Sequence, residues 1–446
     1  MEFDPLKSAH PGQGLAHPES YWAATAGTVP SGDGAVAGDI EAEIAIVGGG
    51  YTGLSCAYHL ARNYGARPVV LEANRAGWGC SGRNGSFVRP GIGRRKYHQW
   101  VEDWGVDAAR ALFAEALAGV GTVRGLIRDG NIECDVQSDG WLKIAHRQSR
   151  VADLERDRQV LNDLFGFKAE LLDPEAIAAG HFRGKEAWGA LRAGGSFGMH
   201  PLKLANGIAR MAQEAGAVLH EGSPVTDMTR DGGMHVLTTP GGRVRARIVV
   251  LAVNGYGPEL HRATRGRVLP VLSNIVVTRP MTAAEKQDAN FVTSDVMFDT
   301  RTLLNYFRLL PDDRILLGNR GPLRDAPATQ ARHRDELLAA IHRKFPALRA
   351  ITADYFWGGW VAVSLDSMPH VTTAEDDPSL FYGMGYCGTG VSAAIQMGRR
   401  LAERIGGGAA LLPVLDTVLP RMPLAAFRRL GQAAMFRWFR WRDERG

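Results

Sequence analysis

Apolar residues near the start of the chain form two short strand-like runs with a helical stretch between them. The first run, Ile44–Val47, leads directly into a Gly-x-Gly-x-x-Gly sequence that begins at Gly48. Leu54–Arg62 carries small and apolar residues at helical spacing, and a second apolar run, Pro68–Leu71, ends at Glu72. The order strand, tight turn, helix, strand and acidic residue is typical of a dinucleotide-binding unit.

Each part of this unit has a physical role if a dinucleotide binds. Gly48 permits the tight turn, Gly50 lets the backbone approach a pyrophosphate, and Gly53 lets the helix lie close to the strand. The helix N-terminus offers unpaired N–H groups and the positive end of its dipole to the phosphates. Glu72 stands where a carboxylate accepts hydrogen bonds from the adenosine ribose. An ordinary glycine-rich turn would explain neither the second strand nor the acidic residue.

A second glycine-rich turn occurs close to the end of the chain. Leu380–Gly383 predicts a strand, Gly385–Gly390 a turn, and Val391–Ile405 a helix with a small, apolar face. The N-terminus of this helix would favour electron density at the N1–C2=O edge of a flavin. Because NAD needs only one such turn, two turns favour FAD over NAD.

Between the two turns the pattern is first helical and then strand-like. We expect residues 97–180 to be mostly helical and residues 268–365 to be mostly antiparallel sheet. The predicted elements are helices at Val106–Arg128, at Asp173-Pro174, at Leu204–Ala215 and at Ala331–Lys344, strands at Val218–Glu221, Val225–Met228, Met234–Thr238, Arg243–Leu251 and Val271–Thr278, and a hairpin of Tyr306–Leu310 with Ile315–Gly318.

These elements predict an α/β plus α+β protein, with a Rossmann-type FAD-binding domain and a discontinuous antiparallel-sheet substrate domain. At 446 residues the chain is long enough for two domains. The expected segments are an N-terminal arm (1–40), three parts of the FAD-binding domain (41–96, 194–260 and 366–410), a mostly helical segment of the substrate domain (97–193), its antiparallel sheet (261–365) and a basic C-terminal helix (411–446).

Charge is concentrated at the end of the chain. The net charge is +5, and residues 421–446 supply all of it, with seven arginines against Asp443 and Glu444. The other 420 residues carry 45 basic and 45 acidic side chains, so a broad nucleic-acid surface is not expected.

Cysteine spacing and hydropathy indicate the cellular compartment in which the protein is expected. The four cysteines have neither Cys-x-x-Cys nor zinc-ligand spacing, so we expect no metal site and no disulfide framework. No run of eighteen apolar residues occurs, and the first forty residues have no signal-peptide core. We therefore expect a cytoplasmic protein.

The basic C-terminal segment has an amphipathic pattern with two interpretations. Apolar residues recur at three- and four-residue steps, at Leu424, Phe427, Leu430, Ala434, Trp438 and Trp441, and arginines lie between them at Arg428, Arg429, Arg437, Arg440 and Arg442. In one interpretation residues 421–446 make a peripheral contact with the inner face of a membrane, which would favour a quinone as electron acceptor. In the other, the helix packs on its own protein and its arginines are solvated.

Several motifs together resemble the FAD-dependent D-amino acid oxidase superfamily, and within it the γ-glutamylputrescine oxidoreductase branch. The resemblance covers most of the chain and rests on Ser20–Thr25, Val47–Gly53, Trp78–Gly85, Tyr306–Gly318, Trp357–Gly359, Asp366–His370 and Gly385–Val391. The Ser-Gly-Arg-Asn-Gly loop, followed much later by Gly-Tyr-x-Gly-x-Gly-Val, is the most specific combination. The resemblance implies FAD as the cofactor and a small amine or amino acid as the substrate. Its C–N bond would be oxidised to an imine by hydride transfer to flavin N5, and the imine would then be hydrolysed. The electron acceptor would be O2 or a quinone.

The same resemblance implies which residues hold the cofactor. They are Gly48, Gly50, Tyr51, Thr52, Gly53, Glu72, Ala73, Gly79, Cys80, Ser81, Arg83, Asn84, Gly85, Pro224, Val225, Asn254, Gly255, Gly388, Thr389, Gly390 and Val391. Cys387 and Thr389 stand where the family pattern has Ser and His, so contacts to the flavin ring are expected to differ. Trp357–Trp360 contains no cysteine at the place where sarcosine-oxidase relatives tether flavin, so non-covalent FAD is expected.

The substrate side is less defined by the sequence. The flavin itself is the catalytic group in this chemistry, and the candidates to contact substrate are His370, Tyr306, Arg308 and Trp360. Arg308 would bind a substrate carboxylate by bidentate pairing. The alternative to an enzyme is an FAD-binding electron-transfer or assembly subunit without its own substrate, which the long antiparallel section disfavours.

Overall fold

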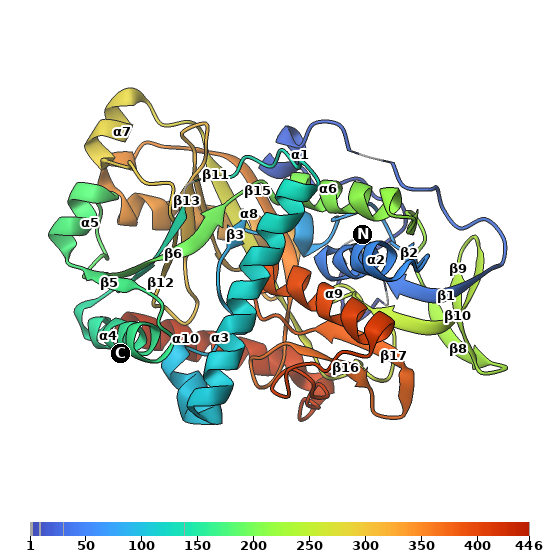
Figure 1. The fold of residues 1–446 in the computed structure, drawn as a ribbon. Coiled ribbons are helices and arrows are strands. Elements are labelled where there is room, and N and C mark those ends of the chain that lie inside the picture. The colour runs from blue at the N-terminus through green and yellow to red at the C-terminus, as the bar shows by residue number, and fades with distance from the viewer. Residues whose placement is uncertain (1–2, 9, 30, 138, 446) are drawn as a thin grey trace.

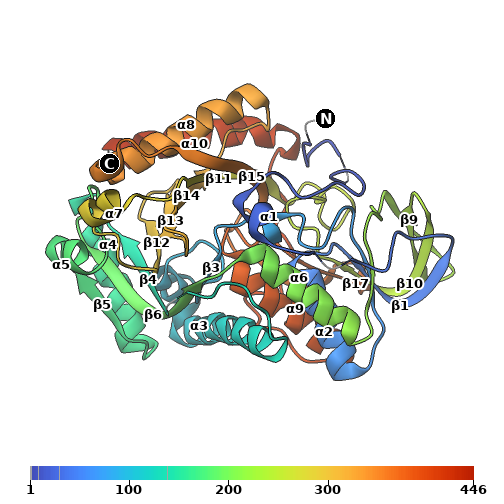
Figure 2. The ribbon, with the colours of Figure 1, turned by 90° about the horizontal axis from the view of Figure 1, so that it is seen from above.

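Two mixed β-sheets organise the structure, a computed structural model that describes residues 3–8, 10–29, 31–137 and 139–445 (Figure 1). Within these residues one sheet has eight strands and the other has nine. Helices cover the first sheet, while the second lies beside it and has helices of its own, among them α8 (Pro327–Lys344) against β11 (Leu269–Thr278) and β14 (Ile315–Arg320) (Figures 1 and 2).

The eight-stranded sheet contains the predicted dinucleotide unit. Strand β1 pairs in parallel with β2 on one side and with β10 on the other, so Ala45 lies between Val69 and Val249. The sheet runs β16 (His370–Ala374), β17 (Asp377–Met384), β10 (Gly242–Leu251), β1 (Ile40–Val47), β2 (Val69–Leu71) and β7 (Val218–His220), with β9 (Met234–Thr239) and β8 (Asp227–Asp231) continuing from β10. Residues 218–251 thus supply four strands of the sheet that contains the first glycine-rich turn.

One strand start was predicted too early. The sequence places a strand at Val225–Met228, but β8 begins at Asp227. Pro224 has no N–H to give to a strand ladder, and the buried Val225 instead packs into the wall of a cavity.

Three helices lie together on this sheet, and a long fourth helix crosses them. Helix α2 (Tyr51–Tyr64) packs between α6 (Pro201–Glu214) and α9 (Gly390–Gly407), and α3 (Tyr97–Asp129) packs on α9 (Figures 1 and 2). Gly105 leaves helical geometry inside α3, with φ of 80°, so the predicted helix start at Val106 is the start of its second part.

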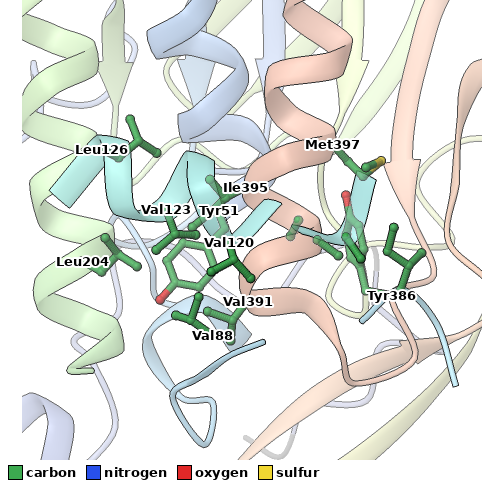
Figure 3. Close-up of a cluster of buried hydrophobic side chains, with 14 of the residues drawn as sticks. Tyr51, Val88, Val120, Val123, Leu126, Leu204, Tyr386, Val391, Ile395 and Met397 are labelled. Carbon is green, nitrogen blue, oxygen red and sulfur yellow. The ribbon is translucent and has the colours of Figure 1, made fainter. Parts of the chain in front are cut away.

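A hydrophobic core joins these four helices (Figure 3). It includes Val123 of α3, Leu204 of α6 and Ile395 of α9, each fully buried, and the ring of Tyr51 at the start of α2. Burying each of these aliphatic side chains stabilises the fold by roughly 1.5–3 kcal/mol relative to exposure. The N-terminus of α2 is thereby fixed against the helices around it.

The nine-stranded sheet takes strands from the segment expected to be mostly helical. Residues 97–193 do contain long helices, yet they also supply three strands of this sheet. Its strands are β15 (Ala353–Val363), β11 (Leu269–Thr278), β14 (Ile315–Arg320), β13 (Tyr306–Leu309), β12 (Val296–Asp299), β4 (Asp139–Ile144), β6 (Ala190–Gly198) and β3 (Phe87–Val88), with β5 (Ala169–Leu172) beside β6. Strand β4 pairs in parallel with the distant β12, and such a partner leaves no local signal. The expected boundary at 193/194 falls inside β6.

The remaining helices are short or peripheral. They are α1 (Tyr21–Thr25), α4 (Val151–Gln159), α5 (Pro174–Gly180), α7 (Ala283–Ala289), α8 (Pro327–Lys344) and α10 (Arg428–Arg445). The predicted cap of α5 is confirmed, because the Ala176 N–H donates to Asp173 Oδ1 at 2.7 Å. Tyr21 and Trp22 of α1 are buried, so part of the N-terminal arm belongs to the core.

Candidate functional site

The turn from β1 into α2 is so tight that its glycine positions have no room for a side chain. Gly48 has φ of +108°, and a Cβ on Gly53 would lie 2.0 Å from the Gly48 carbonyl oxygen. The N-cap residue Gly50 has no side chain to cap α2, and Ser81 Oγ accepts from only the Tyr51 N–H at 2.8 Å. The positive end of α2 therefore keeps capacity to bind an anion.

The turn from β17 into α9 has the same character. Cys387 and Gly388 have positive φ values of 55° and 97°, and the N-cap Thr389 makes no capping bond to the helix. Its hydroxyl donates instead to the Gly93 carbonyl at 2.9 Å. The Cys387 N–H donates to the Ala362 carbonyl at 2.9 Å, which fixes the turn against β15.

Glu72 lies behind the first turn and organises it. Its carboxylate accepts hydrogen bonds from the N–H of Gly49 at 2.7 Å and from the N–H of Asn74 at 2.9 Å. Burial raises the pKa of Glu72 to about 7, against the opposing effect of these backbone bonds. The carboxylate also lines the cavity described below, at the end where an adenosine ribose is expected.

The small-residue loop after Glu72 is held by buried hydrogen bonds. The Asn84 amide donates to the carbonyls of Cys80 and Ser81 at 3.0 and 2.9 Å. The indole N–H groups of Trp22 and Trp357 donate to the Asn84 and Arg83 carbonyls at 3.0 and 2.9 Å. The predicted loop is therefore preorganised by tryptophans from both ends of the chain.

Both turns and this loop open onto one cavity of about 760 Å³. This volume is within the range of small-molecule and cofactor sites. The cavity is lined by most of the expected cofactor residues, namely Gly48, Gly50, Tyr51, Thr52, Glu72, Ala73, Gly79, Cys80, Ser81, Arg83, Asn84, Gly85, Val225, Asn254, Gly388, Thr389, Gly390 and Val391. Gly53, Pro224 and Gly255 are not in its wall; a Cβ on Gly255 would lie 2.5 Å from the Trp360 carbonyl oxygen, so this glycine acts through packing.

Of the four candidates for substrate contact, only Tyr306 lines the cavity. His370 is 2% exposed, and its ring bonds to Thr417 and Asp366. Arg308 is 1% exposed, and its guanidinium donates to Gln137 and to the Met199 carbonyl. Trp360 packs with Trp78, Tyr256 and Leu272. None of these three side chains lines the cavity and each has partners inside the protein, so substrate contact by them stays a prediction that the cavity wall does not support.

Among the cationic residues of the cavity wall that the sequence analysis did not single out, three arginines have no carboxylate partner in the part of the chain that the structure describes. Arg89, Arg94 and Arg320 line the cavity, and none of them forms an ion pair with a carboxylate among the described residues. Burial lowers the pKa of all three guanidinium groups, that of Arg94 to about 9. Arg94 and Arg320 each donate to a backbone carbonyl, of Thr302 and of Cys387. Arg89 and Arg94 are close in the sequence, but Arg320 joins them only in the folded chain, so no spacing in the sequence groups all three.

Helix α10 forms part of the cavity wall. The cavity-lining residues of this helix are Gln432, Met435, Phe436, Phe439 and Arg442. The loop before β13 closes the same side, because the Asp443 carboxylate accepts from the N–H groups of Thr302 and Leu303 at 2.9 and 3.0 Å. The C-terminal helix is thus packed on its own protein, as one of the two interpretations states, but Arg428 and Arg429 form ion pairs with Glu259 and Asp4 instead of being solvated.

Comparison with known proteins gives this site a family. The family model described as FAD dependent oxidoreductase, the DAO family, matches residues 43–404. The chain belongs to the DAO family of FAD-dependent oxidoreductases. Gamma-glutamylputrescine oxidoreductase of Escherichia coli is 31% identical over 422 residues, which cover 93% of this chain and 95% of that protein. The probable oxidoreductase OrdL of Haemophilus influenzae is 29% identical over 385 residues, which cover 84% and 85%.

Solved structures agree on the fold. The crystal structure of glycine oxidase from Geobacillus kaustophilus superposes with a TM-score of 0.69 at 20% identity, covering 86% of this chain and 100% of that one. This likeness concerns the fold, while the family match makes the chain an FAD-dependent oxidoreductase.

The DAO-family cavity fits FAD by its own chemistry. Two helix N-termini without side-chain caps open onto it, which suits an extended group with negative charge at two places. The Arg83 guanidinium stacks at 3.9 Å over the Trp78 ring and leaves Nη2 without a partner among the described residues. Residues of the first turn, Glu72 and the 78–86 loop would hold one end of the cofactor, and residues 387–391 would hold the other.

Proposed function

We propose that this protein oxidises the C–N bond of a small amine or amino acid that carries a carboxylate, using non-covalently bound FAD. The observation that carries this proposal is the group of three arginines without carboxylate partners in a cavity between two uncapped helix N-termini. FAD, when bound, supplies the hydride acceptor at N5, so that the C–N bond becomes an imine that water hydrolyses.

The arginines support an anionic substrate group. A cation buried without a counter-ion is costly, and a carboxylate that pairs with it in the cavity removes that cost. Two further donors are available, because the indole N–H groups of Trp100 and Trp141 are buried in the cavity wall without a partner among the described residues. The Arg89 guanidinium lies 4.8 Å above the Phe298 ring, and this ring stacks with Trp141, so these groups form one layer.

The chain's own residues supply positioning rather than a base. Tyr306 hydroxyl bonds to Ser273 Oγ at 3.1 Å, and burial raises the pKa of Tyr306 to about 12, so it stays neutral at working pH. The substrate amine must therefore lose its proton to water or to another group of the site before oxidation. Phe298, Phe436 and Phe439 give the cavity an apolar wall that excludes water from the reacting carbon.

The cysteines near the cavity support non-covalent FAD. The Cys80 thiol donates to the Trp360 carbonyl at 2.9 Å, and burial raises its pKa to about 11. Cys387 is 1% exposed, and its thiol donates to the Gly385 carbonyl. Both are protonated thiols and therefore poor nucleophiles toward a flavin.

The test begins with the purified protein. We expect one FAD per chain that is released by acid or heat, and an anaerobic screen of amines and amino acids in which a carboxylate-bearing amine bleaches the flavin. Flavin that stays on the denatured chain contradicts non-covalent binding. Bound flavin that no amine bleaches favours an electron-transfer subunit instead. Reoxidation of the reduced enzyme by air or by a soluble quinone then distinguishes O2 from quinone as acceptor.

A further inference from the structure

Helix α10 does not separate its apolar and polar residues between an inner and an outer side as an ordinary surface helix does. A surface helix normally buries its apolar stripe and exposes its polar residues. Here the buried side includes Gln432 and Asp443, which are 1% and 9% exposed, whereas Trp438 and Trp441 are 52% and 53% exposed. The outer side therefore has no partner within the described chain.

The exposed apolar residues are concentrated in this segment. Twelve large hydrophobic side chains of the described residues are exposed, and six of them lie in residues 424–441. Leu430, Ala434, Trp438 and Trp441 form a stripe at helical spacing along the outside of α10, and Phe427 continues it below the helix start. This set, from Phe427 to Trp441, is called the outer stripe below. α10 runs along one edge of the molecule (Figure 2), and the residues of the stripe are exposed there.

Packing of α10 on the body does not use the outer stripe. At its start, Arg428 pairs with Glu259 at 2.9 Å, and Arg429 pairs with Asp4 at 2.9 Å. At its end, Asp443 holds Thr302, and Arg147 donates to the Arg442 carbonyl at 2.9 Å. Polar bonds at both ends thus fix the helix while its outside stays free.

Arginines flank the outer stripe. Arg437 and Arg440 are exposed, and Arg437 adjoins the stripe on the helix; no ion pair of either is found within the described residues. Residues 421–446 carry seven arginines, and of their two acidic residues Asp443 is turned inward. A second copy of the chain bound symmetrically through this face would bring like charges together. An anionic surface would complement them.

We propose that the outer stripe of α10 docks the protein on an anionic lipid bilayer. Tryptophans favour the boundary between headgroups and acyl chains, and arginines reach from there to the phosphates. The contact is peripheral, since no helix of the described residues has the length and apolar character needed to span a bilayer. Because the opposite side of α10 lines the cavity, docking places this cavity wall at the membrane. Lipid binding does not depend on the proposed substrate.

The test is co-sedimentation of the full-length holoprotein with vesicles of equimolar phosphatidylglycerol and phosphatidylcholine, and with vesicles of phosphatidylcholine alone. We expect binding to the anionic vesicles at low salt and its loss at about 1 M salt, where the screening length falls to about 3 Å. Trp438→Ala with Trp441→Ala, and separately Arg437→Glu with Arg440→Glu, should each weaken partitioning at least about tenfold.

Matched controls lie elsewhere on the surface. Trp188→Ala removes a tryptophan that is 51% exposed, and Arg62→Glu with Arg247→Glu makes the same change in charge at exposed sites. Both controls should bind vesicles nearly as the unchanged protein does. Only variants with the flavin content and the Tm of the unchanged protein are compared. If the tryptophan variant does not fold, the charge-reversal variant still tests the proposal. Absence of binding at low salt, equal weakening by the controls, or a dimer that only the α10 variants dissociate would each overturn the proposal.

Discussion

Thr52 Oγ1 and the Tyr386 hydroxyl share a buried hydrogen bond of 2.8 Å. Thr52 lies in the first turn of α2, and Tyr386 lies in the turn before α9, so the bond joins the two glycine-rich turns directly. Both residues also line the cavity. Two motifs that are far apart in the sequence are therefore held in one fixed geometry for the two ends of a cofactor.

This bond should couple the two turns energetically. We expect Thr52→Val and Tyr386→Phe each to lower stability and FAD affinity, because each leaves a buried hydroxyl without its partner. The double variant should lose less unfolding free energy than the two single variants lose together. The difference should be roughly 0.5–1.5 kcal/mol, the usual net value of one hydrogen bond. Urea unfolding and flavin titration of the four proteins measure this coupling. Strict additivity would show that the bond does not link the turns.

The close approach of α2 to the first turn predicts an unusual sensitivity to one methyl group. Gly53→Ala places a Cβ 2.0 Å from the Gly48 carbonyl oxygen, which only backbone movement can relieve. We expect lost flavin content and a destabilisation of about 1–3 kcal/mol. Gly121→Ala in α3 is the control, since nothing lies within 4 Å of its Cβ. That change should be neutral or stabilise by about 0.5–1 kcal/mol.

Recognition of a carboxylate by the cavity arginines predicts a defect that depends on the substrate. Arg89→Met should raise KM for the best carboxylate-bearing amine by about tenfold to a hundredfold, as expected for the loss of a charged hydrogen bond. The methyl ester of the same substrate is the control and should be affected little. Steady-state kinetics at equal flavin content give the comparison. An equal loss for acid and ester would remove Arg89 from carboxylate binding.

The hydrogen bonds between Asp443 and the loop before β13 predict that this loop becomes more mobile when Asp443 is replaced. Asp443→Ala leaves the N–H groups of Thr302 and Leu303 without an acceptor, so their amides should exchange with solvent at least about tenfold faster. KM should rise as well, because this loop lines the cavity. The neighbouring Glu444→Ala is the control, since its side chain is exposed. Unchanged exchange at 300–304 would mean that α10 does not hold the loop.

A buried histidine at the start of α6 predicts a pH dependence of stability. His200 Nδ1 accepts from the Lys203 N–H at 3.2 Å, and Nε2 bonds to Thr25 Oγ1 at 3.0 Å. Burial lowers the pKa of His200 to about 4, so on acidification the unfolded chain takes up the proton first, near pH 6.5. Stability from this group is therefore full above about pH 6.5 and is lost as the pH falls toward 4, by up to about 3 kcal/mol.

His200→Asn keeps a cap acceptor and removes the titration. Its unfolding free energy, measured by urea at several pH values, should depend less on pH between about 6.5 and 4 than that of the unchanged protein. Parallel profiles for the two proteins would contradict the assignment, because other buried groups would then account for the whole dependence.

The amino-acid sequence by itself determined the parts of this protein whose signal is local. The Gly48–Gly53 turn with its flanking strands and Glu72, the second turn at Gly385–Gly390, and the capped helix at Asp173 all appear in the structure as predicted. Each depends on the conformational limits of glycine and proline or on capping within a few residues, so the pattern and its cause are close together.

Only the tertiary structure decided which side chains reach the cavity. Arg308 and Arg320 lie on neighbouring strands of one sheet, yet the first donates to Gln137 inside the protein and the second lines the cavity. The sequence likewise identified the apolar stripe of α10 but not that this stripe is the exposed one, because arginines at Arg428 and Arg429 find Glu259 and Asp4 in distant segments. Burial of a side chain depends on partners brought together by long-range pairing, and no local spacing encodes them.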